Sequence, residues 1–371
     1  MSRLLVGATL ALLLAGCDSG TGQNAENLSY EDLGPFKTDA DGLVDVPWDM
    51  PEGVVSSEVF CGPYGYDTLA TADDVTDASG SAVYDDDAPS SGGLRVSVLD
   101  DTLPVLVPVS PNLEAAAGTW TLGLYISASD LPTTVSCAAI NRIGDTAATN
   151  TVDVNLVFVG VDGLSAGLNA QSGAGHEGLQ SALTTLDDLW SDLGLAVGNV
   201  RYTDFDGATD TYTTIEGAEE FGDLLRTASD GPELTFFFVQ DIDLGDGASI
   251  LGLSGGPPGV AGYGGTSKSG VVINAADLDA SPDEIALIMA HEGGHFLGLF
   301  HPTEKDLTGV DPLDDTPECS DSDGDGALTS AECAGSGAEN VMWPTAQVGT
   351  ATTFSADQGW VVARNPITIP D

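Results

Sequence analysis

Histidine is rare in this chain, and three of its four histidines lie within the stretch HEGGHFLGLFH, residues 291–301. A few residues upstream, the segment SPDE at 281–284 has the pattern of a capping box: a serine cap, a proline at the first helical position and a glutamate three residues after the cap. The glycine at 298 can adopt the left-handed conformation that ends a helix. We therefore expect a helix from near 282 to near Gly298, and the fold must place it where its histidines can act together.

The spacing of the histidines on this helix indicates a metal site. His291 and His295 are four residues apart, so both imidazoles project from one face at a separation that one cation can bridge, with Glu292 beside them. Two ligands leave a zinc site incomplete, and His301 follows Gly298 at a point where the backbone can turn back toward the metal. Three neutral nitrogens leave a fourth position for water, which is typical of catalytic rather than structural zinc sites.

The pattern His-Glu-x-x-His-x-x-Gly-x-x-His is the signature of the metzincin metallopeptidases, and the chain matches it at every specified position. Metzincins also have a methionine turn beneath the metal, and ENVMWP supplies Met342. Over roughly 285–344, the segments GLFHPTE and DPLDDTPEC resemble the pappalysin family. The resemblance implies an α+β metzincin-type catalytic domain with a mixed twisted sheet, an active-site helix and a methionine turn. Several metzincins, pappalysins included, have a tyrosine two residues after that methionine, and Pro344 stands here instead.

The function implied by this resemblance is a zinc endopeptidase acting on a protein or peptide substrate. Zinc would polarise the scissile carbonyl and lower the pKa of its water, and Glu292 would accept the proton as general base and deliver it to the leaving amine. Two alternatives remain open. One is a catalytically inactive calcium-binding envelope lipoprotein on a metzincin fold, and the other is a metal-dependent amidase that acts on cell-wall peptides.

A second metal-ligand pattern, DSDGDGALTSAE, lies at residues 321–332. The template of an EF-hand calcium loop assigns its ligand positions to Asp321, Asp323, Asp325, Ala327, Thr329 and Glu332. Residues on either side are poor helix formers, so we expect an isolated calcium loop with a structural role, which orders the segment leading to the methionine turn. The alternative is a solvated acidic turn in a very acidic chain.

The first seventeen residues, MSRLLVGATLALLLAGC, contain an apolar run from 4 to 14. A run this short cannot span a bilayer as a helix, which needs about 20 residues, so it predicts a cleaved export signal. Its end resembles the lipobox of bacterial lipoproteins, which implies that Cys17 carries lipid, although an ordinary signal peptide is the alternative. The resemblance implies a protein of the bacterial cell envelope that contacts the membrane through this lipid only.

Cysteine usage agrees with export. Setting Cys17 aside leaves four cysteines, and export to an oxidising compartment favours disulfides among them. Of the three connectivities, proximity in the sequence favours Cys61 with Cys137 and Cys319 with Cys333. Acidic residues number 58 against 9 basic ones, for a formal net charge of -49, which repels nucleic acid and anionic membrane surfaces. We therefore exclude nucleic-acid partners.

The distribution of apolar residues predicts the domain boundaries. Residues 18–44 are polar and are expected to be a flexible tether. Residues 45–148 alternate at period two, as at 94–98 and 120–126, which predicts a β-sandwich accessory domain. Strand and helix patterns then alternate through 151–371, the expected metallopeptidase domain, with a helix at 179–193. Within it, the glycine-rich stretch 252–265 is expected to be a surface loop near a cleft.

Overall fold

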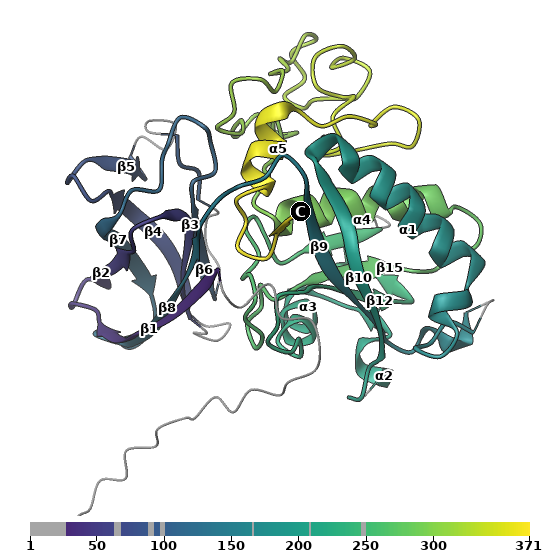
Figure 1. Ribbon diagram of the computed structural model, residues 1–371, viewed down its shortest axis with the longest axis horizontal. Coiled ribbons are helices and arrows are strands. Elements are labelled where there is room, and N and C mark those ends of the chain that lie inside the picture. The colour runs from purple at the N-terminus through teal and green to yellow at the C-terminus, as the bar shows by residue number, and fades with distance from the viewer. Residues whose placement is uncertain are drawn as a thin grey trace, which may run out of the picture.

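A computed structural model describes residues 27–62, 68–87, 93–96, 101–164, 167–207, 209–245 and 250–371. They form two units that lie side by side, one built of strands and the other of a sheet with helices (Figure 1). The expected export signal, with Cys17, and residues 18–26 of the expected tether lie outside the described residues. Among the described residues, no helix has the length and apolar character needed to cross a membrane.

The N-terminal unit consists of two four-stranded antiparallel sheets around one apolar core. One sheet has the order β1-β8-β3-β6 and the other the order β2-β7-β4-β5. The strands are β1 Leu28–Lys37, β2 Leu43–Met50, β3 Val54–Cys61, β4 Leu69–Thr76, β5 Ala82–Asp85, β6 Leu103–Val107, β7 Gly118–Ser127 and β8 Thr134–Ile143.

Alternating side chains build this core. Trp120 and Leu122 of β7 are completely buried, as the period-two pattern predicts, and the Trp120 ring packs on Trp48 of β2 at 5.9 Å between centroids. The disulfide between Cys61 and Cys137 is present and joins β3 to β8, which pair at these residues. Strands β3 and β8 are therefore joined by backbone pairing and by a covalent bond.

Two expectations for this unit are wrong. The flexible tether predicted over 18–44 is wrong for residues 28–37, which form β1 and pair along β8. A polar edge strand forms because it hydrogen-bonds to its neighbour in the sheet, and its own sequence does not reveal that neighbour. Leu94 and Val96 are buried but belong to no strand, and the rest of that predicted strand lies outside the described residues.

The C-terminal unit has a sheet of order β10-β9-β12-β15-β14, with β16 paired to β9. Strands β9, β10, β12 and β15 are parallel, whereas β14 and β16 run antiparallel to their neighbours. The bounds of its strands are β9 Asn150–Phe158, β10 Leu195–Asp204, β11 Thr214–Ile215, β12 Leu234–Val239, β13 Asp241–Ile242, β14 Gly252–Ser254, β15 Val271–Asn274 and β16 Ile369–Pro370. Its helices are α1 Glu177–Trp190, α2 Thr209–Tyr212, α3 Ala218–Leu225, α4 Pro282–Phe296 and α5 Ala356–Val362.

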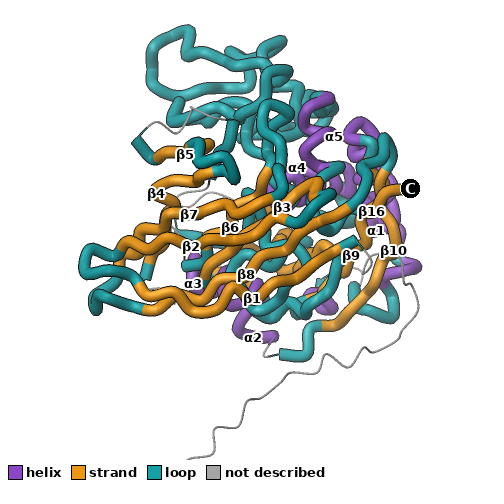
Figure 2. The backbone as a smooth tube through the Cα atoms, turned by 60° about the vertical axis from the view of Figure 1, so that its left-hand side comes forward, coloured by secondary structure: helices purple, strands orange, loops and turns teal. Residues whose placement is uncertain are grey.

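Helices cover both faces of this sheet. Helices α1 and α4 pack on each other and on one face, where their apolar residues share a core with alternate residues of β9 and β12. Helix α3 contributes Leu224 and Leu225 to a smaller core on the opposite face. The segment between α4 and α5 forms long loops at one end of the molecule (Figure 2). Residues for a site at the end of α4 therefore come from a rigid helix and from these loops.

Helix α4 begins where the sequence predicts but is capped differently. Pro282 occupies the first turn, yet the Ser281 side chain makes no capping hydrogen bond, so the expected capping box is not formed. The N–H of Glu284 bonds instead to the carbonyl oxygen of Ser281, at 3.0 Å. Gly298 has a φ of +100° and ends the helix as expected. Burial of the apolar face, rather than the cap, therefore secures this helix.

The glycine-rich stretch 252–265 packs between the two units and is not the expected surface loop. Ala261 is completely buried. A Cβ atom at Gly256 would lie 2.4 Å from the carbonyl oxygen of His295, and one at Gly259 would lie 2.1 Å from the ring of Phe296. The glycines therefore allow the backbone to approach the end of α4, a use of glycine that composition cannot distinguish from flexibility.

Buried polar groups join the two units. Arg142 of β8 donates hydrogen bonds to the carbonyl oxygens of Ala363 and Asn365, at 2.6 and 3.0 Å. Glu58 of β3 is completely buried, and one of its oxygens accepts a hydrogen bond from the backbone N–H of Ala261 at 3.2 Å. Its other oxygen has no hydrogen-bond partner among the described residues, and burial raises the pKa of this carboxyl to about 8.

Candidate metal centre

Three histidine rings converge at the end of α4. His291 and His295 project from the helix, and the turn at Gly298 brings His301 back toward them. The Nε2 atom of His301 lies 3.1 Å from that of His295 and 3.4 Å from that of His291. The first two rings are buried and the third is partly exposed. The structure thus brings together the three residues that the spacing predicts as ligands.

The outer nitrogens of the two helical ligands are already occupied. Nδ1 of His291 lies 2.7 Å from the carbonyl oxygen of Val341, and Nδ1 of His295 lies 2.7 Å from that of Leu299. A carbonyl oxygen can only accept, so each Nδ1 carries the proton and each Nε2 keeps a lone pair. Lone pairs that face one another this closely repel unless a cation lies between them. The donor set therefore fits a metal ion, and three imidazole nitrogens suit zinc.

Burial also keeps these rings neutral. It lowers the pKa of His291 to about 4, with a further contribution from the neighbouring His301. Burial and the two neighbouring rings hold the pKa of His295 well below the usual 6.5. Neutral imidazole is the form that binds a metal, so no proton has to leave these two rings before binding at neutral pH.

Glu292 follows the first ligand on α4 and is half-buried. Burial raises its pKa to about 8, although the backbone N–H of Ser254 in β14 donates to the carboxylate and opposes this shift. A Cβ atom at Gly252 would lie 2.9 Å from Cγ of Glu292, so the edge strand packs directly against this side chain. A nearby cation would favour the ionised form. A carboxyl group that can exist in both states beside a metal centre is suited to moving a proton.

Met342, which the sequence predicts in a methionine turn, packs against α4 at Gly294. Met342 is completely buried, and its Sδ atom lies 2.5 Å from the position of a Cβ added at Gly294. Its N–H donates to the side chain of Asn340 at 2.8 Å, and Asn340 is paired with Gln358 of α5 by hydrogen bonds of 2.8 and 3.1 Å. The preceding residue, Val341, supplies the carbonyl that orients His291. The turn therefore supports one ligand, and the need for glycine at 294 went unrecognised in the sequence.

Two further residues of the centre were missed by sequence reasoning. Oε2 of Glu304 lies 2.7 Å from Nδ1 of His301, and its Oε1 accepts a hydrogen bond of 2.7 Å from Arg95 of the N-terminal unit. Burial raises the pKa of Glu304, but the hydrogen bond from His301 and the charge of Arg95 outweigh it, so this pKa is lowered. Glu304 could have been found from its position three residues after His301. Arg95 is remote in the sequence and carries no such signal.

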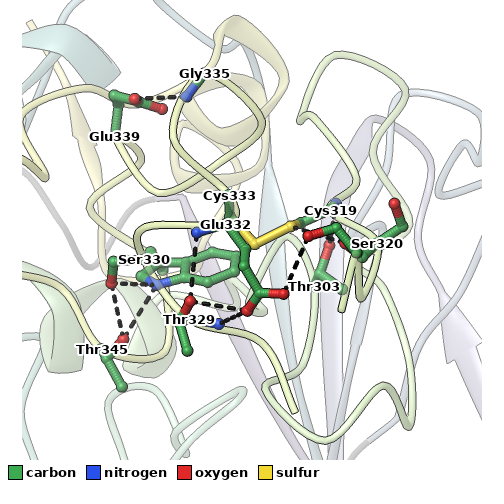
Figure 3. The surroundings of a disulfide bond; sticks show 12 residues. Thr303, Cys319, Ser320, Thr329, Ser330, Glu332, Cys333, Gly335, Glu339 and Thr345 are labelled. Carbon is green, nitrogen blue, oxygen red and sulfur yellow. Dashed lines mark hydrogen bonds between the residues drawn. A yellow bond between two sulfur atoms is a disulfide. The ribbon is translucent and has the colours of Figure 1, made fainter. Parts of the chain in front are cut away.

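The predicted calcium loop brings part of its ligand set together. Within 4.8 Å of one another lie carboxylate oxygens of Asp321, Asp323 and Asp325. The carboxylate of Glu332 instead accepts hydrogen bonds from the N–H and hydroxyl of Thr329, at 3.1 and 2.8 Å (Figure 3). The N–H of Ala327 donates to Asp325 at 3.0 Å. Every residue between α4 and α5 is described and none is helical, in agreement with an isolated loop.

This loop is tied through its apolar side to Trp343, the residue after Met342. The predicted disulfide between Cys319 and Cys333 is present and brackets the loop (Figure 3). Leu328 is 1% exposed and belongs to one small core with the disulfide and Trp343. The indole N–H of Trp343 lies 3.1 Å from the hydroxyls of Ser330 and Thr345. The loop is thus held close to the segment that orients His291.

Comparisons with known proteins found no matching family model and no matching curated protein. Among solved structures, the chain is similar to archaemetzincin from Methanopyrus kandleri, with 15% identity, a TM-score of 0.30, and coverage of 58% of this chain and 88% of that one. It is similar to metalloproteinase-II from Bacteroides fragilis, with 14% identity, a TM-score of 0.28, and coverage of 47% and 58%. A zinc-dependent peptidase from Methanocorpusculum labreanum shows 15% identity, a TM-score of 0.25, and coverage of 40% and 82%. These likenesses are remote, and the metal centre itself must indicate the function.

Proposed function

We propose that the protein is a zinc-dependent endopeptidase that hydrolyses peptide bonds in protein or peptide substrates. One observation supports this above all: the Nε2 atoms of His291, His295 and His301 converge, while the Nδ1 atom of each ring is held by an oxygen. Rings held in this way are ready to bind a cation. Glu292 lies beside them on the same helix, as a general base must.

The roles of the side chains follow from their positions. His291, His295 and His301 would hold zinc, which supplies a Lewis acid to polarise the scissile carbonyl and to acidify a water molecule. Glu292 accepts the proton of the attacking water and delivers it to the nitrogen of the leaving amine. The carbonyl oxygens of Val341 and Leu299 keep the two helical rings in the tautomer that binds a metal.

Replacement of Glu292 by glutamine tests this role. The E292Q variant should lose about 10²- to 10⁴-fold in the rate of casein or gelatin cleavage, because the amide cannot accept the proton. Its zinc content, measured by atomic absorption, should equal that of the wild type. E284Q, a charge change two turns earlier on α4, is the matched control and should keep full activity. Full activity of E292Q would remove Glu292 from the mechanism.

A zinc chelator in the same digestion assay separates the endopeptidase from an inactive metal-binding lipoprotein. Cleavage that stops with the chelator and returns with zinc supports the endopeptidase. A zinc-loaded wild type without cleavage would support the inactive protein instead.

Within the metzincins, DPLDDTPEC and ENVMWP support assignment to the pappalysin family.

Calcium binding by residues 321–332 is part of the proposal. The EF-hand spacing supports it, as does the proximity of the aspartate carboxylates. Bound calcium would relieve the repulsion among these groups and order the loop that is anchored to Trp343. Terbium luminescence on the wild type and on D321N measures this site directly.

Lipid anchoring at Cys17 in the bacterial cell envelope is supported by the sequence alone, because this segment lies outside the described residues. Metabolic labelling with radioactive palmitate should mark the wild type but not C17S. Equal labelling of both proteins would contradict anchoring at this residue.

A further inference from the structure

Arg95 of the N-terminal unit reaches across to the segment that carries the third histidine. Its neighbours Leu94 and Val96 are buried in the core of the N-terminal unit, so its backbone is anchored there. Its guanidinium donates hydrogen bonds of 2.7 Å to the carbonyl oxygen of Val310 and to Oε1 of Glu304. It also lies over the ring of Phe300, 4.7 Å from the centroid. Three different contacts therefore fix this side chain against residues 300–310.

Glu304 connects Arg95 to the metal centre. One carboxylate oxygen accepts from Arg95 and the other lies 2.7 Å from Nδ1 of His301. Because the two oxygens belong to one planar carboxylate, the contact that restrains one oxygen also restrains the other. The ring of His301 is thus oriented by a side chain that is itself oriented from the other unit.

His301 needs such support more than the other two ligands do. His291 and His295 stand on a helix, are buried, and bond to backbone carbonyls of their own unit. His301 lies in a loop, its side chain is 21% exposed, and its outer partner is a side chain. A loop ligand without an outer partner is free to rotate, and loss of an outer partner costs about 10- to 100-fold in metal affinity.

We propose that Arg95 is a positioning residue for the metal centre: through Glu304 it holds the ring of His301 in the orientation that binds the metal. This inference rests on His301 being a metal ligand, as proposed above. The N-terminal unit then has a part in metal binding, beyond the role of an accessory or spacer domain. Contact between Leu106 of this unit and the helix-ending Gly298 places a second N-terminal group beside the same turn.

The test measures metal binding by the full chain, not only activity. Zinc affinity is determined by competition with a chromogenic chelator, and the geometry of the site is followed by the visible absorption spectrum of the cobalt-substituted protein. R95M and E304A should each bind zinc about 10- to 100-fold more weakly and show an altered cobalt spectrum. The double variant should be no weaker than E304A, because both changes break one chain of contacts.

R142M is the matched control, since Arg142 also crosses between the units but bonds to backbone carbonyls after α5 and not to the segment that carries His301. It should lower the stability of the apoprotein in urea without changing zinc affinity. If R142M does not fold, N112A, which removes an exposed contact to Asp314, takes its place.

Two results would overturn the inference in different ways. Unchanged zinc affinity and cobalt spectrum in R95M and E304A, with binding by the wild type, would show that Arg95 serves only to join the units. If R142M or N112A weakened zinc binding as much as R95M does, this would also show that Arg95 serves only to join the units. Absence of zinc and cobalt binding by the wild type would overturn the proposed function itself, and the role of Arg95 with it.

Discussion

Among the described residues, two clusters of side chains could hold a metal ion, and they are built in opposite ways. The histidine cluster is largely buried, and all three of its outer nitrogens are bound by oxygens. The aspartates of the acidic loop are largely exposed. Asp321 accepts hydrogen bonds from the N–H groups of Gly324 and Gly326, at 2.6 and 2.9 Å, so the loop turns are already closed by local contacts. In both clusters the candidate ligand atoms lie close together, but different contacts hold the side chains that carry them.

The groups that surround the ligands, rather than the types of ligand, therefore determine how strongly each site depends on its metal. Preorganised rings give up little entropy on binding, whereas exposed carboxylates repel one another and are hydrated until an ion arrives. We therefore expect zinc to be held tightly and to govern activity. Calcium should be held more weakly and should act on stability.

The largest effect should come from removing a ligand at the buried cluster. H301A should lower zinc affinity by more than about 100-fold, the range for losing only an outer partner, and should abolish cleavage. D323N, at the exposed cluster, should leave zinc affinity unchanged. Chelator competition and casein digestion on both variants measure this contrast. If D323N lost as much zinc affinity as H301A, the two clusters would not differ in their effect on zinc binding.

A large effect is also expected from Glu58, whose carboxyl is completely buried. The pKa of Glu58 is raised from 4.5 to about 8. The folded protein therefore keeps a proton that the unfolded chain releases between these values, and the free energy of unfolding falls as pH rises through that window, by about 1.4 kcal/mol per pH unit. E58Q should be more stable than the wild type at pH 8 by a few kcal/mol and equally stable at pH 4. Urea unfolding at the two pH values measures the difference, and an equal difference at both would contradict it.

An intermediate effect is expected from packing beneath the buried cluster. In G294A the new methyl group would lie 2.5 Å from Sδ of Met342, which must shift. Overpacking costs about 1–3 kcal/mol, of which the better helix propensity of alanine offsets about 1 kcal/mol. The variant should unfold at lower urea concentration and bind zinc more weakly, because Val341 next to the displaced Met342 holds His291. Wild-type stability in urea and wild-type zinc affinity would mean that Met342 shifts without moving the carbonyl group of Val341.

The smallest effect should come from the exposed cluster. For the exported calcium-binding protein that we propose, the expected dissociation constant is about 10⁻⁴–10⁻³ M, so millimolar calcium should add about 1 kcal/mol to the free energy of unfolding. Thermal unfolding of the zinc-loaded protein with and without millimolar calcium measures this, with D321N as the control that should not respond. No shift in the wild type would argue for a solvated acidic turn.

Local patterns account for what could be predicted in advance. The strand at 118–127 and the helix at 177–190 follow from periodicity, the end of α4 follows from glycine at a helix end, and its start agrees with the expected proline in the first turn. Both disulfides follow from cysteine proximity. The long tether and the exposed glycine-rich loop failed, because each depends on which distant residues pack against the segment. The capping box failed as well, since the side chain of Ser281 makes no capping hydrogen bond.

The sequence by itself determined which residues can bind a metal, since ligand spacing on a helix is a local property of 3.6 residues per turn. It also determined the strongly acidic charge, from which we predict that the protein has no nucleic-acid partners. Only the tertiary structure decided how the ligands are held: Val341 reaches His291 from a distant turn, and Arg95 reaches Glu304 from the other unit. The physical reason is that a hydrogen bond acts over about 3 Å in space regardless of separation along the chain, and folding alone sets those distances.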